Sequence, residues 1–133
     1  MENKSQNYKV LIVDDFSEII ELLKRVLRNI GNIEAEIATT GVQAFSKLQY
    51  FHPSLIILDA EMPGCNGEDF LRKIKQDEEL KNIKILGYTG LPAEGRMFEI
   101  LGVDKVIIKS SKESEIDNLQ KEIIKLLGIK DSE

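Results

Sequence analysis

Cysteine and long apolar runs are both scarce in this chain. Its 133 residues include one cysteine, Cys65, which excludes an internal disulfide and favours a reducing compartment. No apolar stretch approaches the ~18 residues that a membrane-spanning helix needs. Residues 1–7 are polar and lack the apolar core of a secretion signal. We therefore expect a cytoplasmic protein that does not insert into a membrane.

The chain has fewer basic than acidic residues, and its first apolar run is not followed by a glycine-rich phosphate-binding loop. The chain has 18 lysine and arginine residues against 23 aspartate and glutamate residues, a net charge of -5 at pH 7. Nucleic-acid-binding surfaces are usually basic, so this balance argues against direct contact with nucleic acid. Neither the P-loop pattern nor G-x-G-x-x-G follows the first apolar run. A nucleotide is therefore not the expected ligand.

What the sequence does contain is an alternation of short apolar runs and amphipathic segments. The runs predict five buried strands of a parallel sheet, at Tyr8–Val13, Ile33–Ala38, Ser54–Asp59, Ile83–Gly87 and Lys105–Ile108. Helical periodicity predicts five helices, at about 16–30, 41–49, 66–76 and 93–101, and a last one that follows Ser110 and ends at Gly128. This alternation predicts a flavodoxin-like, doubly wound α/β domain with strand order 2-1-3-4-5. We assign residues 1–128 to this domain and residues 129–133 to a polar C-terminal tail.

Two short polar patterns predict where helices begin. Thr40 with Gln43, and Ser110 with Glu113, have the spacing of a capping box. In that motif the first side chain accepts a hydrogen bond from a backbone N–H of the first helical turn, which has no partner inside the helix. We therefore expect the second and fifth helices to begin just after Thr40 and Ser110.

Polar side chains stand where four of the predicted strands end. Asp14 and Asp15 follow the first strand, Asp59 ends the third, and Thr89 and Lys109 follow the fourth and fifth. Ligands of open parallel sheets bind at the carboxyl ends of the strands, so we expect these side chains to meet at one edge. At ~5 Å and an effective dielectric of ~20, each pair of like charges costs about 3 kcal/mol. Mg2+ prefers oxygen ligands and removes this repulsion, so the three aspartates predict a magnesium site.

The other two residues of this set suit phosphoryl oxygens. Lys109 supplies a positive charge and Thr89 a hydroxyl donor. Together with a metal and a carboxylate nucleophile, they make up the parts needed for phosphoryl transfer. Because no nucleotide loop is present, we expect a small or protein-borne phosphoryl donor.

Five segments carry a wider pattern: Lys9–Asp15, Pro53–Asp59, Met62–Gly64, Thr89, and Gly102–Asp104 leading to Lys109. In this order and at these strand ends, they resemble the receiver domain of response regulators, of the chemotaxis-regulator-like type. Receiver domains are the phosphoryl-accepting part of two-component signalling. The resemblance covers nearly the whole chain.

The resemblance implies a role for each residue of the set. Asp59 would accept a phosphoryl group from a kinase phosphohistidine, and Asp14 and Asp15 would bind Mg2+ together with Asp59 and the backbone carbonyl of Glu61. The threonine and the lysine would contact the phosphoryl group. The partners would be a sensor histidine kinase or phosphotransfer protein and an unidentified downstream protein or output domain. The chain would then be a switch for a protein-interaction surface and not an enzyme.

The sequence departs from the family pattern beyond the acceptor. Val106 takes the place of a frequent aromatic residue, and Ser110 takes the place of the usual proline after Lys109. A cis peptide bond without proline costs about 3 kcal/mol, so we expect the Lys109–Ser110 bond to be trans. Pro92 and Gly95 predict a clipped or irregular fourth helix.

Two alternatives follow from these departures and from Glu61. The replacements at Val106 and Ser110 are consistent with a degenerate receiver that binds partners without phosphorylation. Glu61 lies two positions after Asp59, the spacing of the second acid in aspartyl-phosphate phosphatases, which makes a phosphatase the weaker alternative. Within a receiver, the same Glu61 carboxylate is expected to tune dephosphorylation or metal affinity.

Overall fold

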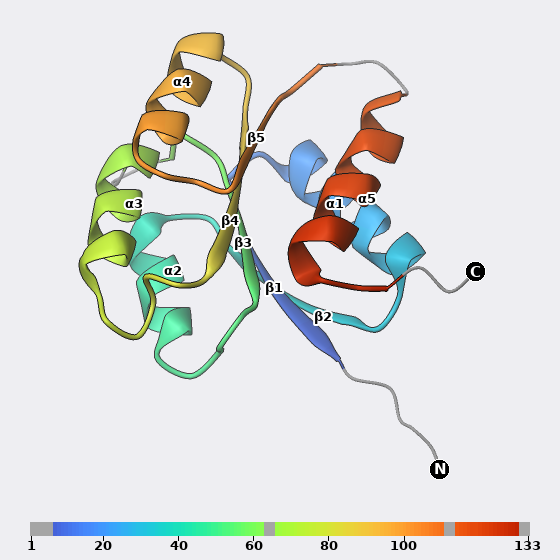
Figure 1. The fold of residues 1–133 in the computed structure, drawn as a ribbon, viewed down its shortest axis with the longest axis horizontal. Coiled ribbons are helices and arrows are strands. Elements are labelled where there is room, and N and C mark those ends of the chain that lie inside the picture. Colours follow the sequence, from blue (N-terminus) through green and yellow to red (C-terminus); the bar gives the residue numbers. More distant parts are fainter. Residues whose placement is uncertain (1–6, 63–65, 111–113, 131–133) are drawn as a thin grey trace.

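Five parallel strands form one sheet in the order β2-β1-β3-β4-β5, with helices on both faces (Figure 1). The structure is a computed structural model that describes residues 7–62, 66–110 and 114–130. The strands are β1 Tyr8–Val13, β2 Ile33–Ala38, β3 Leu55–Leu58, β4 Lys84–Thr89 and β5 Lys105–Ile108. The helices are α1 Ser17–Ile30, α2 Gly41–Leu48, α3 Gly67–Gln76, α4 Pro92–Ile100 and α5 Ser114–Leu127. The predicted flavodoxin-like, doubly wound fold and its strand order are confirmed.

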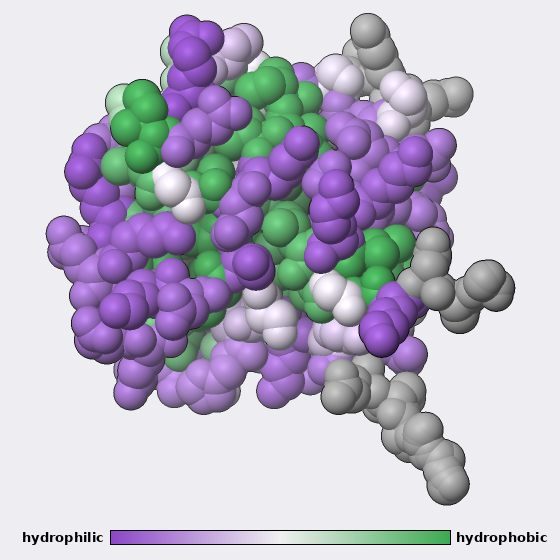
Figure 2. All heavy atoms as spheres, in the orientation of Figure 1, coloured by the Kyte–Doolittle hydropathy of each residue, from purple (hydrophilic) through white to green (hydrophobic). Residues whose placement is uncertain are grey.

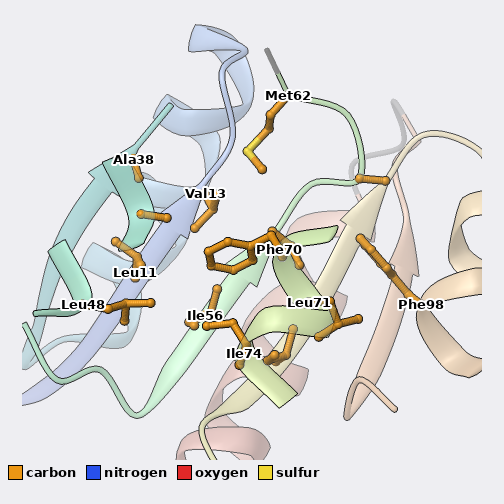
Figure 3. Close-up of a cluster of buried hydrophobic side chains, with 14 of the residues drawn as sticks. Leu11, Val13, Ala38, Leu48, Ile56, Met62, Phe70, Leu71, Ile74 and Phe98 are labelled. Atoms are coloured by element: carbon orange, nitrogen blue, oxygen red, sulfur yellow. The ribbon is translucent and has the colours of Figure 1, made fainter. Parts of the chain in front are cut away.

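Hydrophobic residues of the central strands supply two cores, one on each face of the sheet. Along β3, Ile56 and Leu58 belong to the core under α2, α3 and α4, while Leu55 and Ile57 belong to the core under α1 and α5. Figure 3 shows the first core, with Phe70 of α3 near its centre. Both faces are covered, and for this reason the strands read as continuous apolar runs in the sequence.

Two strands differ from the prediction: each begins one residue later, β3 at Leu55 and β4 at Lys84, and their carboxyl ends also differ. β3 covers only Leu55–Leu58, so Asp59 lies just beyond the strand and not at its last position. β4 extends further than predicted and includes Thr89, because its last two residues pair with Ile107 and Ile108 of β5. The predicted strand stops at Gly87 because the continuous apolar run is interrupted there, so the pattern does not extend to Tyr88 and Thr89.

Helix starts agree with the sequence where they are described. The Thr40 side chain accepts a hydrogen bond of 3.0 Å from the backbone N–H of Gln43 and so caps α2, as predicted. The second predicted capping box pairs Ser110 with Glu113, which lies outside the described residues, as do Cys65 and residues 131–133 of the predicted tail. In the described part of the chain, no helix is both long and apolar enough to cross a membrane.

Helix α4 is short but regular, so of the two forms expected for it, clipped or irregular, the structure has the first. The helix is continuous from Pro92 to Ile100 and contains Gly95 without a break. A Cβ at Gly95 would lie 2.9 Å from Cδ1 of Ile108 and 3.0 Å from Cγ1 of Val106. The glycine therefore serves close packing of α4 on β5 and does not end the helix.

Phe98 of α4 packs where two glycines leave room for its ring. The side chain is 1% exposed and extends from α4 toward the sheet (Figure 3). A Cβ on Gly87 of β4 would come within 2.4 Å of the ring, and a Cβ on Gly67 of α3 within 3.0 Å. The ring therefore contacts the backbone of two other elements and anchors α4 close to the carboxyl edge of the sheet.

We expect Gly87→Ala to lower the free energy of unfolding by about 1–3 kcal/mol, because the new methyl group overpacks the site of the Phe98 ring. Urea titration followed by circular dichroism measures this change. Gly90→Ala is the matched control, since nothing lies within 4 Å of a Cβ there, and its effect should be below about 0.5 kcal/mol. Equal stability of the two variants would contradict the packing argument.

Candidate functional site

The ends of β1 and β3 bring three carboxylates together. Asp14 and Asp59 are buried, Asp15 is exposed, and one ligand oxygen from each lies within 4.8 Å of the others. The backbone N–H of Asp59 donates to the carbonyl of Val13 at 2.9 Å, which continues the pairing of β3 with β1 past the strand end. One Asp14 oxygen also accepts the N–H of Phe16 at 2.9 Å, at the start of α1. Backbone geometry thus holds the carboxylates that the sequence predicted to meet.

Lys109 places its ammonium between the two buried carboxylates. Its Nζ lies 3.2 Å from Oδ1 of Asp59 and 3.3 Å from Oδ2 of Asp14. The Lys109 backbone N–H donates to the carbonyl of Thr89 at 2.7 Å, so the residue continues the β4–β5 pairing by one position. One ammonium against three carboxylates leaves an excess of negative charge in the cluster.

The acidity of Asp59 reflects this excess. Burial and the neighbouring Asp14 charge raise the pKa of Asp59 to about 6, although Lys109 and the N–H of Ala60 act in the opposite direction. A divalent cation would favour the ionised form and remove the repulsion. Hard carboxylate oxygens, close together and open to solvent on the Asp15 side, fit Mg2+ as a donor set.

An open hollow of 510 Å³ lies over the cluster. It is lined by Asp15, Asp59, Glu61, Met62, Thr89, Gly90, Leu91, Glu94 and Lys109. Every predicted site residue except the more deeply placed Asp14 therefore faces one space. The direction of the Glu61 backbone carbonyl, the predicted metal ligand, stays a prediction.

Glu94 is a site residue that the sequence analysis missed. The buried Thr89 hydroxyl donates to Oε1 of Glu94 at 2.5 Å. This hydrogen bond connects the end of β4 to the first turn of α4. Glu94 also forms a hydrogen bond with the exposed Glu61, and this contact raises the pKa of the Glu61 carboxyl. The mouth of the hollow is therefore acidic. A signal was present, since Glu94 is the acidic residue in the first turn of the helix that follows Thr89.

The fold and site together define a flavodoxin-like domain with an acidic, lysine-containing site at the carboxyl edge of its sheet. Within that class, the chain belongs to the response regulator receiver domain family, whose model matches residues 10–121. The resemblance inferred from the sequence is confirmed.

Individual relatives agree with this assignment. Chemotaxis protein CheY-3 of Vibrio cholerae is 35% identical over 107 residues, which cover 79% of this chain and 82% of that protein. The receiver domain of a signal transduction histidine kinase from Syntrophus aciditrophicus superposes with a TM-score of 0.80 at 30% identity over 95% of both chains. The phosphorylated cyanobacterial phytochrome response regulator RcpA gives a TM-score of 0.82 at 26% identity, covering 95% of this chain and 97% of that one.

The raised pKa of Asp59 predicts a pH-dependent effect of Asp59→Asn on stability. Between about pH 4 and 6, the folded protein keeps a proton that the unfolded chain has lost, so its free energy of unfolding falls as pH rises. In EDTA, we expect Asp59→Asn to be more stable than the parent by about 1–3 kcal/mol at pH 7.5 and nearly equal to it at pH 4. Urea titration at the two pH values measures the difference.

The exposed Glu99 provides the control, because Glu99→Gln removes a carboxylate that does not lie in the cluster. Its effect should not grow between pH 4 and pH 7.5. Added Mg2+ should stabilise the parent more than Asp59→Asn. A gain for Asp59→Asn that is the same at both pH values would contradict the electrostatic origin of the effect.

Proposed function

We propose that this receiver domain accepts a phosphoryl group on Asp59 and that the modification changes a protein-interaction surface in two-component signalling. One observation carries the proposal: Asp59, Lys109 and Thr89 line a single open hollow, with the Lys109 ammonium 3.2 Å from Asp59 and the carboxylates of Asp14 and Asp15 beside it. These are a nucleophile, a cation, a metal site and a donor in one place. The relatives add support, since one is a chemotaxis regulator and another has been solved in its phosphorylated form.

The side chains of the site divide the reaction between them. An oxygen of Asp59 forms a bond to phosphorus while the bond from phosphorus to the donor nitrogen or oxygen breaks, and the donor leaves with that electron pair. Asp14, Asp15 and Asp59 would hold Mg2+, with the carbonyl of Glu61, and the bound ion supplies positive charge to the phosphoryl oxygens. Lys109 already touches Asp59 and binds the oxygens that arrive there. The domain acts as a switch and not as an enzyme.

Thr89 links this chemistry to α4. Its hydroxyl now donates to Glu94, the acidic residue of the first turn of α4. A phosphoryl group on Asp59 offers a more highly charged acceptor, so the hydroxyl exchanges partners and Glu94 is released. Phosphorylation of Asp59 thereby removes a hydrogen bond at the start of α4.

The surface next to that point is apolar. Side chains of Leu91, Met97, Ile100 and Ile108 are 52%, 37%, 78% and 37% exposed. Figure 2 shows hydrophobic groups at the surface over α4 and β5. Exposed apolar groups that gather in one place mark interaction sites, so the downstream partner binds here in the proposed mechanism. A sensor histidine kinase or phosphotransfer protein supplies the phosphoryl group.

Incubation with Mg2+ and acetyl phosphate tests the proposal. Intact-mass spectrometry should show one added phosphoryl group on the parent and none on Asp59→Asn. EDTA should abolish the modification, because the carboxylate cluster then keeps its full repulsion. Absence of modification at millimolar Mg2+ would favour a phosphorylation-independent receiver, and repeated turnover of a phosphate ester would favour a phosphatase.

Glu94→Gln should accelerate the same reaction. The variant removes one negative charge from the mouth of the hollow and weakens the hold on the Thr89 hydroxyl. An exposed charge interaction is worth up to about 1 kcal/mol, so we expect a rise of about two- to fivefold in the initial rate. Glu99→Gln lies on the same helix, outside the hollow, and should leave the rate unchanged. Equal rates for the two variants would contradict a role for Glu94.

A further inference from the structure

We propose that Glu115 is a positioning residue that holds the ammonium of Lys109 in the site by way of Ser110 and Tyr88. The inference concerns the placement of Lys109, and only its consequence for phosphoryl binding rests on the proposed function. Three observations carry it: the burial of the Glu115 carboxylate, its bonds to the residue after Lys109, and its bond to the ring beneath Lys109.

The Glu115 carboxylate is buried and fully engaged. The residue is 7% exposed and lies in the first turn of α5. One oxygen accepts from the backbone N–H of Ser110 at 2.6 Å and from the Ser110 hydroxyl at 2.5 Å, and the other accepts from the Tyr88 hydroxyl. A buried carboxylate is costly unless charge-assisted hydrogen bonds and a helix N-terminus compensate it, and both are present here.

The hydrogen bonds from Ser110 to Glu115 fix the backbone on the C-terminal side of Lys109. The Lys109–Ser110 peptide bond is trans, as predicted. Serine has a rotatable φ and a backbone N–H donor at a place where proline would have neither. The Ser110 N–H and hydroxyl both donate to Glu115. The Lys109 N–H donates to the carbonyl of Thr89 at 2.7 Å. The backbone of Lys109 is therefore tied down on both sides.

The bond to Tyr88 fixes the surface on which the ammonium rests. Nζ of Lys109 lies 5.5 Å from the centroid of the Tyr88 ring, within the range of a cation–π contact. The ring is 1% exposed, and its hydroxyl donates to Glu115. Burial and this hydrogen bond raise the pKa of Tyr88 far above its ordinary value, so the phenol remains a donor at physiological pH. Glu115 thus acts on Lys109 by two routes.

Competitive acylation of lysine side chains tests the placement without any phosphoryl chemistry. The protein is labelled with acetic anhydride in metal-free buffer, and peptide mass spectrometry compares Lys109 with the exposed Lys24 and Lys81. In Glu115→Ala we expect Lys109 to react about fivefold faster than in the parent, because the ammonium is no longer held over the ring. Glu115→Gln keeps an acceptor for the Ser110 N–H and should stay near the parent.

Two further variants separate positioning from loss of structure. Glu122→Ala removes another carboxylate of α5, one that pairs with Lys105, and should leave Lys109 labelling unchanged. Tyr88→Phe keeps the ring and removes only the bond to Glu115, so it should give a smaller rise and serves if Glu115→Ala fails to fold. Unchanged Lys109 reactivity in folded Glu115→Ala, or in Tyr88→Phe if that variant alone folds, would overturn the proposal.

Beryllium trifluoride binding then tests the consequence. Glu115→Ala should weaken its affinity about tenfold, the loss expected for a displaced charged donor, while Mg2+ affinity changes less than about twofold. In a Lys109→Ala background, Glu115→Ala should have no further effect, because the residue acts through Lys109. An equal loss in both backgrounds would overturn the positioning role. If the parent binds no beryllium trifluoride, the proposed function fails, and the acylation result alone decides the role of Glu115.

Discussion

Repulsion among carboxylates confined at one edge of a sheet is the constraint on which this structure depends. Asp14 and Asp59 are buried within reach of each other and of Asp15, and one lysine offsets only part of their charge. Such a cluster is unfavourable for folding, so the two hydrophobic cores must supply the stability that keeps it in place. The same repulsion would favour cation binding at this site, because a bound cation would neutralise the cluster and so stabilise the folded protein.

The two groups that would bind a phosphoryl group are held from opposite sides of the sheet. Tyr88 and Thr89 are consecutive in β4, so their side chains face opposite layers. Thr89 reaches Glu94 in the layer of α4, while Tyr88 lies in the layer of α1 and α5 and supports the lysine. A change at the threonine therefore reaches α4 first, and the lysine stays tied to the opposite layer.

The fold and the meeting of the aspartates with Lys109 could be predicted from the sequence because each rests on local signals. Continuous apolar runs revealed the strands, and polar residues at their ends revealed Asp14, Asp59 and Lys109. Glu94 and Glu115 were not predicted, because a glutamate in a first helical turn ordinarily serves the helix dipole in solvent and its position alone does not indicate a site. Their hydrogen bonds to Thr89, Tyr88 and Ser110 are tertiary contacts that the sequence does not specify. The regularity of α4 was hidden in a similar way, since a glycine that serves packing looks in the sequence like one that interrupts a helix.

The packing of Phe98 also limits which substitutions this sequence can accept. The ring occupies space that Gly87 and Gly67 leave free, so the three positions form one volume shared by α4, β4 and α3. A larger residue at Gly87 becomes acceptable only together with a smaller one at position 98, whereas a Cβ at Gly67 would also lie 2.8 Å from the backbone of Asp59 and Ala60. Substitutions at Gly87 and Phe98 should therefore occur together, and a chain that changes Gly87 alone would move α4 away from the sheet.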